Sequence, residues 1–142
     1  MYRFVEDVTL ADVAFEARAP TLAELLAEAA KATMAVMVKD LASIRQTASR
    51  ELRVEAPDAE RLLHKFLEEV VYFKDAEQLL LATFDVRVHE DGGRLTAEAV
   101  ARGEPLDAKR HEQVVDVKAV TWHRFRCAQG AEGWEAFVVL DI

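Results

Sequence analysis

The sequence predicts an α+β fold in which two helices pack on one face of a mainly antiparallel β-sheet. Two segments have apolar residues at helical spacing behind a capping sequence, and several others have alternating apolar residues joined by turn sequences. The order along the chain is strand, helix, strand, helix and then hairpin-linked strands, which disfavours a doubly wound nucleotide-binding fold. The 142 residues contain no repeat or linker, so we expect a single domain, 1–142.

Both helices carry start signals. Thr21 lies three residues before Glu24, which is a capping-box pattern, and apolar residues at helical spacing extend the first helix to about Val38. The second helix begins after Pro57 with Asp58 as its cap. Its apolar stripe consists of Leu62, Leu63, Phe66, Leu67, Val70, Val71 and Phe73. Its polar residues are expected to face water: Glu60, His64, Lys65, Glu68 and Glu69.

Alternating apolar residues predict half-buried strands around 13–17, 52–56 and 84–88. Asp91-Gly92-Gly93 favours a tight turn from the third of these into a strand over 95–101. A strand from Val117 to Cys127 and another from Trp134 to Leu140 are expected to form a longer hairpin. The segment from Gly103 to Val115 is the longest connection outside the strands, and such connections often carry binding residues.

Composition disfavours several classes of protein. A net charge of −8 lacks the excess of Lys and Arg that neutralises phosphates, so we expect no direct nucleic-acid binding. No apolar run approaches the roughly 20 residues of a membrane span, and no signal peptide is recognisable. The lone Cys127 is predicted to be a small buried side chain, and a reducing, cytoplasmic location fits best. The sequence also lacks a glycine-rich phosphate loop, a nucleophile elbow and the spacing of a zinc site.

Three carboxylates form a candidate oxygen-ligand site. Asp12 opens a predicted strand, Asp141 closes another, and the final residue, Ile142, donates an α-carboxylate. Hard cations such as Ca²⁺ and Mg²⁺ select oxygen ligands of this kind. Spacing alone does not bring positions 12 and 141 together, so a turn-capping aspartate and an ordinary terminus stay open as the alternative.

A second group of polar residues surrounds the last predicted hairpin. Lys118 lies among apolar and β-branched residues, where its ammonium group must reach water, a carboxylate or a partner. A solvated lysine is the simpler interpretation, since lysines are common on surfaces. Glu104, Asp107 and His111 are likewise expected in a solvated loop, although their closeness to Lys118 in the chain permits a shared polar patch.

Several motifs together resemble the archease family over nearly the whole chain. The most specific is Val117-Lys118-Ala119-Val120-Thr121-Trp122-His123, followed at a fixed distance by the terminal Asp141-Ile142. The others are Thr9-Leu10-Ala11-Asp12-Val13-Ala14, the capped helix after Pro20, Leu62-Leu63 with Phe66-Leu67-Glu68-Glu69, Gly103-Glu104-Pro105-Leu106-Asp107 and His111-Glu112.

The resemblance implies a non-enzymatic accessory protein that assists the RtcB-type RNA ligase of tRNA splicing by promoting its guanylylation and multiple turnover. It also implies a divalent cation, Ca²⁺ first and Mg²⁺ or Mn²⁺ as alternatives, held by Asp12, Asp141 and Ile142. Lys118 and Glu104 map to the same polar surface, where we expect partner contact. A modulator or chaperone of a tRNA methyltransferase is another role that the resemblance suggests. A metal-dependent hydrolase that uses the carboxylates to activate water is a third hypothesis.

The chain departs from the family pattern at one position. Family members usually carry His-Thr-Ala-Asp where this chain has Thr9-Leu10-Ala11-Asp12. The missing imidazole could otherwise orient the carboxylates through a hydrogen bond or contact a partner.

Overall fold

The computed structural model describes residues 1–5 and 12–142. Its elements in chain order are β1 (Tyr2–Val5), β2 (Asp12–Ala19), α1 (Leu22–Met37), the short 3-10 helix η1 (Leu41–Ser43), β3 (Ala48–Ala56), α2 (Ala59–Glu77), β4 (Leu79–Asp91), β5 (Arg94–Pro105), β6 (Ala119–Val120), β7 (Arg126–Gly130) and β8 (Gly133–Asp141). The predicted α+β class, with two long helices and antiparallel strands, is confirmed.

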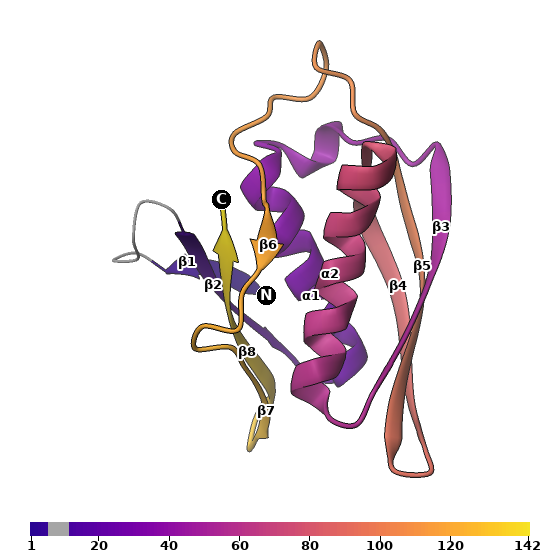
Figure 1. The fold of residues 1–142 in the computed structure, drawn as a ribbon, viewed down its shortest axis with the longest axis vertical. Helices are drawn as coiled ribbons and strands as arrows, with labels where there is room; N and C mark the ends of the chain where they lie inside the picture. Colours follow the sequence, from indigo (N-terminus) through magenta and orange to yellow (C-terminus); the bar gives the residue numbers. More distant parts are fainter. Residues whose placement is uncertain (6–11) are drawn as a thin grey trace.

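The strands form two sheets, and the two long helices lie between them (Figure 1). One sheet has the order β1-β2-β8-β6 with β7 also paired to β8, and the other has the order β3-β5-β4. Every pairing is antiparallel. Each helix contacts strands of both sheets, so one core joins the three layers. Alternation in the sequence predicted the strands but not their division between two sheets.

The helices begin where their capping residues predicted. The Thr21 hydroxyl accepts a hydrogen bond from the Glu24 N–H at 3.2 Å, and the Asp58 carboxylate accepts one from the Arg61 N–H at 2.8 Å. These bonds satisfy N–H groups that have no partner within the helix. Gln78 ends α2 with a φ of 50°, the left-handed conformation that commonly stops a helix.

The hairpin between β4 and β5 is also confirmed. Asp91 lies opposite Arg94, and both glycines of the turn have positive φ, as a two-residue turn of this hand requires. At the other end of the hairpin, Gly103 lies opposite Leu81 beside an irregularity in β4. A Cβ atom on Gly103 would lie 1.7 Å from the carbonyl oxygen of Leu80, so only glycine fits there.

The expected single strand from Val117 to Cys127 is wrong. The structure has two short strands, β6 and β7, which both pair with β8. Between them the Phe125 N–H donates to the Trp122 carbonyl at 3.2 Å, and Arg124 has a φ of 54°. A residue with a side chain seldom adopts positive φ, and the alternating pattern gave no sign of this turn.

Cys127 is buried, as predicted, and burial, with the nearby charges of Glu60 and Asp58, raises the pKa of its thiol to about 12. A thiol with so high a pKa is a poor nucleophile. Within the described ranges, no helix is long and apolar enough to cross a bilayer.

Candidate functional site

The start of β2 and the end of β8 meet at one corner of the five-stranded sheet. Asp12 is the direct cross-strand partner of Asp141, so the two side chains lie on the same face. Ile142 follows at once, and its side chain packs against the core. The positions that sequence spacing could not connect are therefore neighbours, and we call Asp12, Asp141 and Ile142 the carboxylate corner.

The carboxylate corner has oxygen-ligand chemistry. Two aspartates directly opposite each other destabilise a sheet unless positive charge or hydrogen-bond donors compensate. Carboxylate oxygens are the ligands that Ca²⁺ and Mg²⁺ prefer, so these residues fit a hard divalent cation. Among the described residues, no group of three or more His, Cys, Asp or Glu side chains could hold a metal ion. Within residues 1–5 and 12–142 the corner thus offers two carboxylate side chains, and the Ile142 carboxylate, water or a partner could add further oxygens.

Lys118 adjoins the carboxylate corner through its backbone. Its N–H donates to the Asp141 carbonyl at 2.8 Å, and the next residue, Ala119, lies opposite Asp141 in β6. The Lys118 side chain is exposed, which agrees both with a solvated lysine and with a partner contact. Glu104, which we expect on the same polar surface, lies in β5 of the three-stranded sheet.

Glu104 is buried, with 6% of its surface exposed, so the expectation of a solvated loop residue is wrong. Its carboxylate accepts hydrogen bonds from the Arg110 guanidinium, from the Arg45 N–H at 2.9 Å and from His111 Nε2 at 2.8 Å. The Arg110 guanidinium and then the Arg45 N–H lower the pKa of Glu104 from 4.5 to about 2. His111 Nδ1 accepts from the Asp107 N–H at 2.9 Å, so a neutral ring with its hydrogen on Nε2 satisfies both bonds.

Further hydrogen bonds hold the segment between β5 and β6 against both long helices. Two backbone hydrogen bonds tie it to the end of α1 and the residues after it. Lys74 of α2 donates to Asp116 at 2.5 Å and to the Val117 carbonyl at 2.9 Å. Burial alone would lower the pKa of Lys74, but hydrogen bonds to Asp116 and Asp75 outweigh it, and the pKa is raised. The segment therefore reaches the carboxylate corner along a defined path.

His64 is buried under β6, so the expectation that it faces water is wrong. Its Nε2 lies 2.9 Å from the Val120 carbonyl oxygen, and its Nδ1 lies 3.1 Å from a carboxylate oxygen of Glu68. The ring stacks on Trp122 with a centroid distance of 3.8 Å and an interplanar angle of 4°. His64 thus fastens β6 and the following turn to α2.

A sequence signal for the burial of His64 did exist. His64 precedes Leu67 and Val71 by three and seven residues, and both of these are buried on the same side of α2. The polarity of histidine favours a position in water, but the helical position of His64 belongs with the apolar stripe. No comparable signal marked Glu104, whose donors come from distant parts of the chain.

Comparison with known proteins identifies the family. Residues 2–142 match the sequence model of the Archease protein family (MTH1598/TM1083). The chain belongs to the archease family. "Protein archease" of Methanopyrus kandleri is 35% identical over 93% of this chain and 94% of its own length. "Protein archease" of Thermococcus gammatolerans is 37% identical over 93% of each chain.

A solved structure agrees with the archease assignment. The solution structure of Methanobacterium thermoautotrophicum protein 1598 matches 99% of this chain and 98% of its own, with a TM-score of 0.87 and 31% sequence identity. The two-helix fold with antiparallel sheets is therefore an archease fold. Thr9, where this chain departs from the usual archease motif, lies outside the described residues.

Proposed function

We propose that this protein is a non-enzymatic activator of an RtcB-type RNA ligase in tRNA splicing, and that it promotes guanylylation and multiple turnover of the ligase. Membership of the archease family supports an accessory role. The observation that carries the proposal is the pairing of Asp12 with Asp141 beside the backbone of Lys118, because it gathers the most specific family motifs at one corner.

The protein would act by changing the population of ligase conformations. A surface that binds only the conformer able to accept guanylate raises the fraction of that conformer without taking part in the reaction. Lys118 is the side chain to which we assign direct contact, because it is exposed and its backbone is fixed to β8. Glu104 would contribute indirectly, since a direct contact would require its carboxylate to leave three internal donors.

The second part of the proposal is a divalent cation at the carboxylate corner, with Ca²⁺ ahead of Mg²⁺ or Mn²⁺. Asp12 and Asp141 would be side-chain ligands, and Ile142 would contribute its α-carboxylate. A bound cation would add positive charge between the two opposed carboxylates, which would stabilise their pairing across the sheet. Because a ligand that binds only the folded state stabilises it, added Ca²⁺ should raise the melting temperature, and Asp12→Asn should remove this increase. An equal increase in the wild-type protein and in Asp12→Asn would exclude this site.

Multiple-turnover RNA joining by the cognate ligase, with and without this protein, tests the function. Wild-type protein should raise both guanylylation and turnover, whereas Asp12→Ala and Lys118→Ala should abolish the increase while the proteins stay folded. Asp85→Ala is a matched control, because Asp85 is exposed on β4 of the other sheet and should leave stimulation intact. Turnover that is the same with and without wild-type protein would refute the proposal.

Two further experiments separate the alternative functions. Hydrolysis of generic phosphoesters that depends on added metal and is lost in Asp12→Ala would favour a hydrolase. Recovery of a tRNA methyltransferase instead of the ligase from native extract would favour the modulator role.

A further inference from the structure

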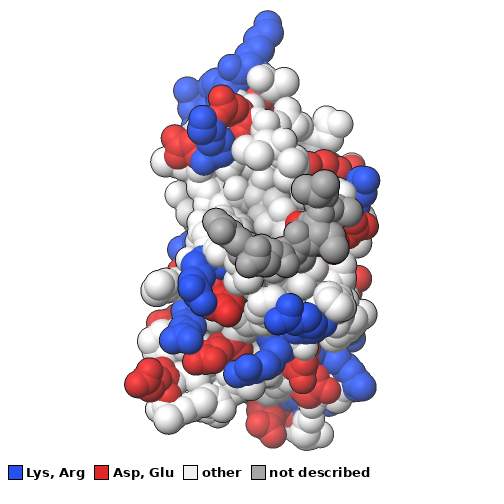
Figure 2. Space-filling view, turned by 90° about the vertical axis from the view of Figure 1, so that its left-hand side faces the viewer, with Lys and Arg blue, Asp and Glu red and all other residues white. Residues whose placement is uncertain are grey.

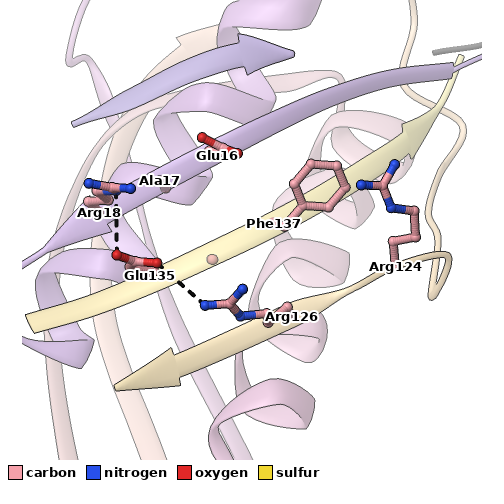
Figure 3. A pocket seen from close by; sticks show the side chains of 8 residues that line it. Glu16, Ala17, Arg18, Arg124, Arg126, Glu135 and Phe137 are labelled. Atoms are coloured by element: carbon pink, nitrogen blue, oxygen red, sulfur yellow. Dashed lines mark hydrogen bonds and ion pairs between the residues drawn. The ribbon is translucent and has the colours of Figure 1, made fainter. Parts of the chain in front are cut away.

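The outer face of the five-stranded sheet carries a second site, away from the carboxylate corner. A hollow of about 330 Å³ lies over β2, β8 and β7 (Figure 3). The side chains that matter for its chemistry are Glu16, Arg18, Arg124, Arg126, Glu135 and Phe137. We call this site the arginine hollow. Asp141 follows Phe137 by four residues along β8, which is about 14 Å at the rise of a strand, so the arginine hollow is distinct from the carboxylate corner.

The arginine hollow is positive in a protein whose net charge is −8. The hollow has three arginines and two carboxylates. One of the carboxylates, that of Glu16, already forms an ion pair at 2.8 Å with Arg3, which lies outside the hollow. Figure 2 faces this sheet and shows Lys and Arg side chains gathered over its lower half, with acidic side chains between them. The local charge therefore attracts an anion, although the protein as a whole repels one.

Arg18 and Arg126 form only weak ion pairs within the hollow. Glu135 lies 3.6 Å from Arg18 and 3.4 Å from Arg126, longer than the about 2.7–2.9 Å of a strong charge-assisted hydrogen bond. Both arginine side chains are about two-thirds exposed, and ion pairs at such positions stabilise a protein little. Their guanidinium groups can therefore turn to a better acceptor at small cost.

Arg124 is held in an unusual conformation beside the hollow. Its φ of 54° is seldom adopted by a residue with a side chain, and its guanidinium carbon lies 4.7 Å from the centroid of the Phe137 ring. Figure 3 shows this guanidinium next to the Phe137 ring, with Arg126 and Arg18 along the adjacent strands. Strained residues that persist at a surface point to a functional constraint, and here the strain positions a charge.

We propose that the arginine hollow binds a phosphate group, either free or as the ester of a nucleotide or RNA. Guanidinium groups form paired hydrogen bonds with phosphate oxygens, and three of them approach the hollow from β2, β7 and the turn before β7. A carboxylate ligand would offer two acceptor oxygens, as Glu135 already does. A phosphate has enough oxygens to accept hydrogen bonds from all three arginines. The volume of about 330 Å³ admits the phosphate together with part of an attached sugar.

Nuclear magnetic resonance titration of the full chain tests the site with four probes: inorganic phosphate, guanosine monophosphate, a single-stranded oligouridylate and an oligoglutamate peptide. We expect saturable shifts at the Phe137 amide with the phosphate-bearing probes. Arg124→Gly and Arg126→Gln should each weaken binding about tenfold, the usual effect of losing a charged hydrogen bond. Glycine tolerates the positive φ at position 124, so the first variant removes the charge without straining the turn.

Arg87→Gln is the matched control, because Arg87 is exposed on β4 of the three-stranded sheet and should not affect binding. Equal affinity for inorganic phosphate and guanosine monophosphate would identify phosphate as the recognised group. Tighter binding of the oligouridylate would identify an RNA backbone as the source of that phosphate. No saturable shift with a phosphate-bearing probe, binding of oligoglutamate alone, or equal weakening in Arg87→Gln would each overturn the proposal.

Discussion

Replacement of His64 by alanine is the most direct test of the link between α2 and β6. The change leaves the buried Val120 carbonyl, now 2.9 Å from Nε2, without its donor, which costs about 1–3 kcal/mol. Loss of the stacked Trp122 pair costs about 0.5–1.5 kcal/mol more. Glu68 is 58% exposed, so its 3.1 Å contact with His64 Nδ1 contributes at most about 1 kcal/mol. We expect the free energy of unfolding to fall by about 2–4 kcal/mol.

Urea unfolding measures this loss, and thermal unfolding should show a decrease of about 3 °C per kcal/mol for a chain of this length. His89→Ala is the matched control, because His89 is an exposed histidine on β4 and its loss should change the free energy by less than about 0.5 kcal/mol. His64→Phe keeps a stacked ring and removes both hydrogen bonds. Its loss of unfolding free energy should therefore lie between that of His89→Ala and that of His64→Ala. A loss in His64→Ala no larger than that in His89→Ala would refute the buried anchor.

Three further predictions concern buried positions. Because the fold lowers the pKa of Glu104 from 4.5 to about 2, its ionised form stabilises the protein fully above about pH 4.5, and this contribution is lost as the pH falls toward 2. Urea unfolding over this pH range should therefore show a smaller loss of stability in Glu104→Gln than in the wild-type protein. Equal losses in the two proteins would contradict the lowered pKa of Glu104. Gly103→Ala should cost about 3 kcal/mol or more in thermal unfolding, because its Cβ meets the fixed carbonyl of Leu80, and a cost below about 1 kcal/mol would show that the strands part easily. The Cys127 thiol, with its pKa raised to about 12, should resist alkylation at neutral pH until urea unfolds the chain, so rapid labelling of the folded protein would contradict its burial.

The features that sequence predicted best depend on local chemistry. Thr21 and Asp58 cap their helices through hydrogen bonds to residues three positions away, so the sequence itself contains both partners. The turn at Gly92-Gly93 requires positive φ, which glycine supplies without strain. In the same way, apolar spacing indicated which face of each helix is buried. These elements needed no knowledge of the rest of the chain.

The features that sequence missed depend on distant partners. The Val120 carbonyl that holds His64 lies 56 residues along the chain, and the Arg45 N–H that holds Glu104 lies 59 residues away. Polar side chains are usually at the surface, which predicts an exposed position for both. Each is buried because it has a hydrogen-bond partner, the Arg45 N–H for the Glu104 carboxylate and the Val120 carbonyl for His64 Nε2. The meeting of Asp12 and Asp141 has the same character, since alternation fixes faces but not which strands pair.

The position of β8 in the chain has a consequence for biosynthesis. β8 joins β2, β6 and β7, and all three emerge from the ribosome before it. The three-stranded sheet consists of residues up to Pro105, so it can form in a nascent chain before β8 is synthesised. The five-stranded sheet lacks its central strand until then. A translation product interrupted within β8 would expose the apolar inner faces of its unpaired strands, so we expect chaperones or proteases to bind it instead of its folding to a stable shorter form.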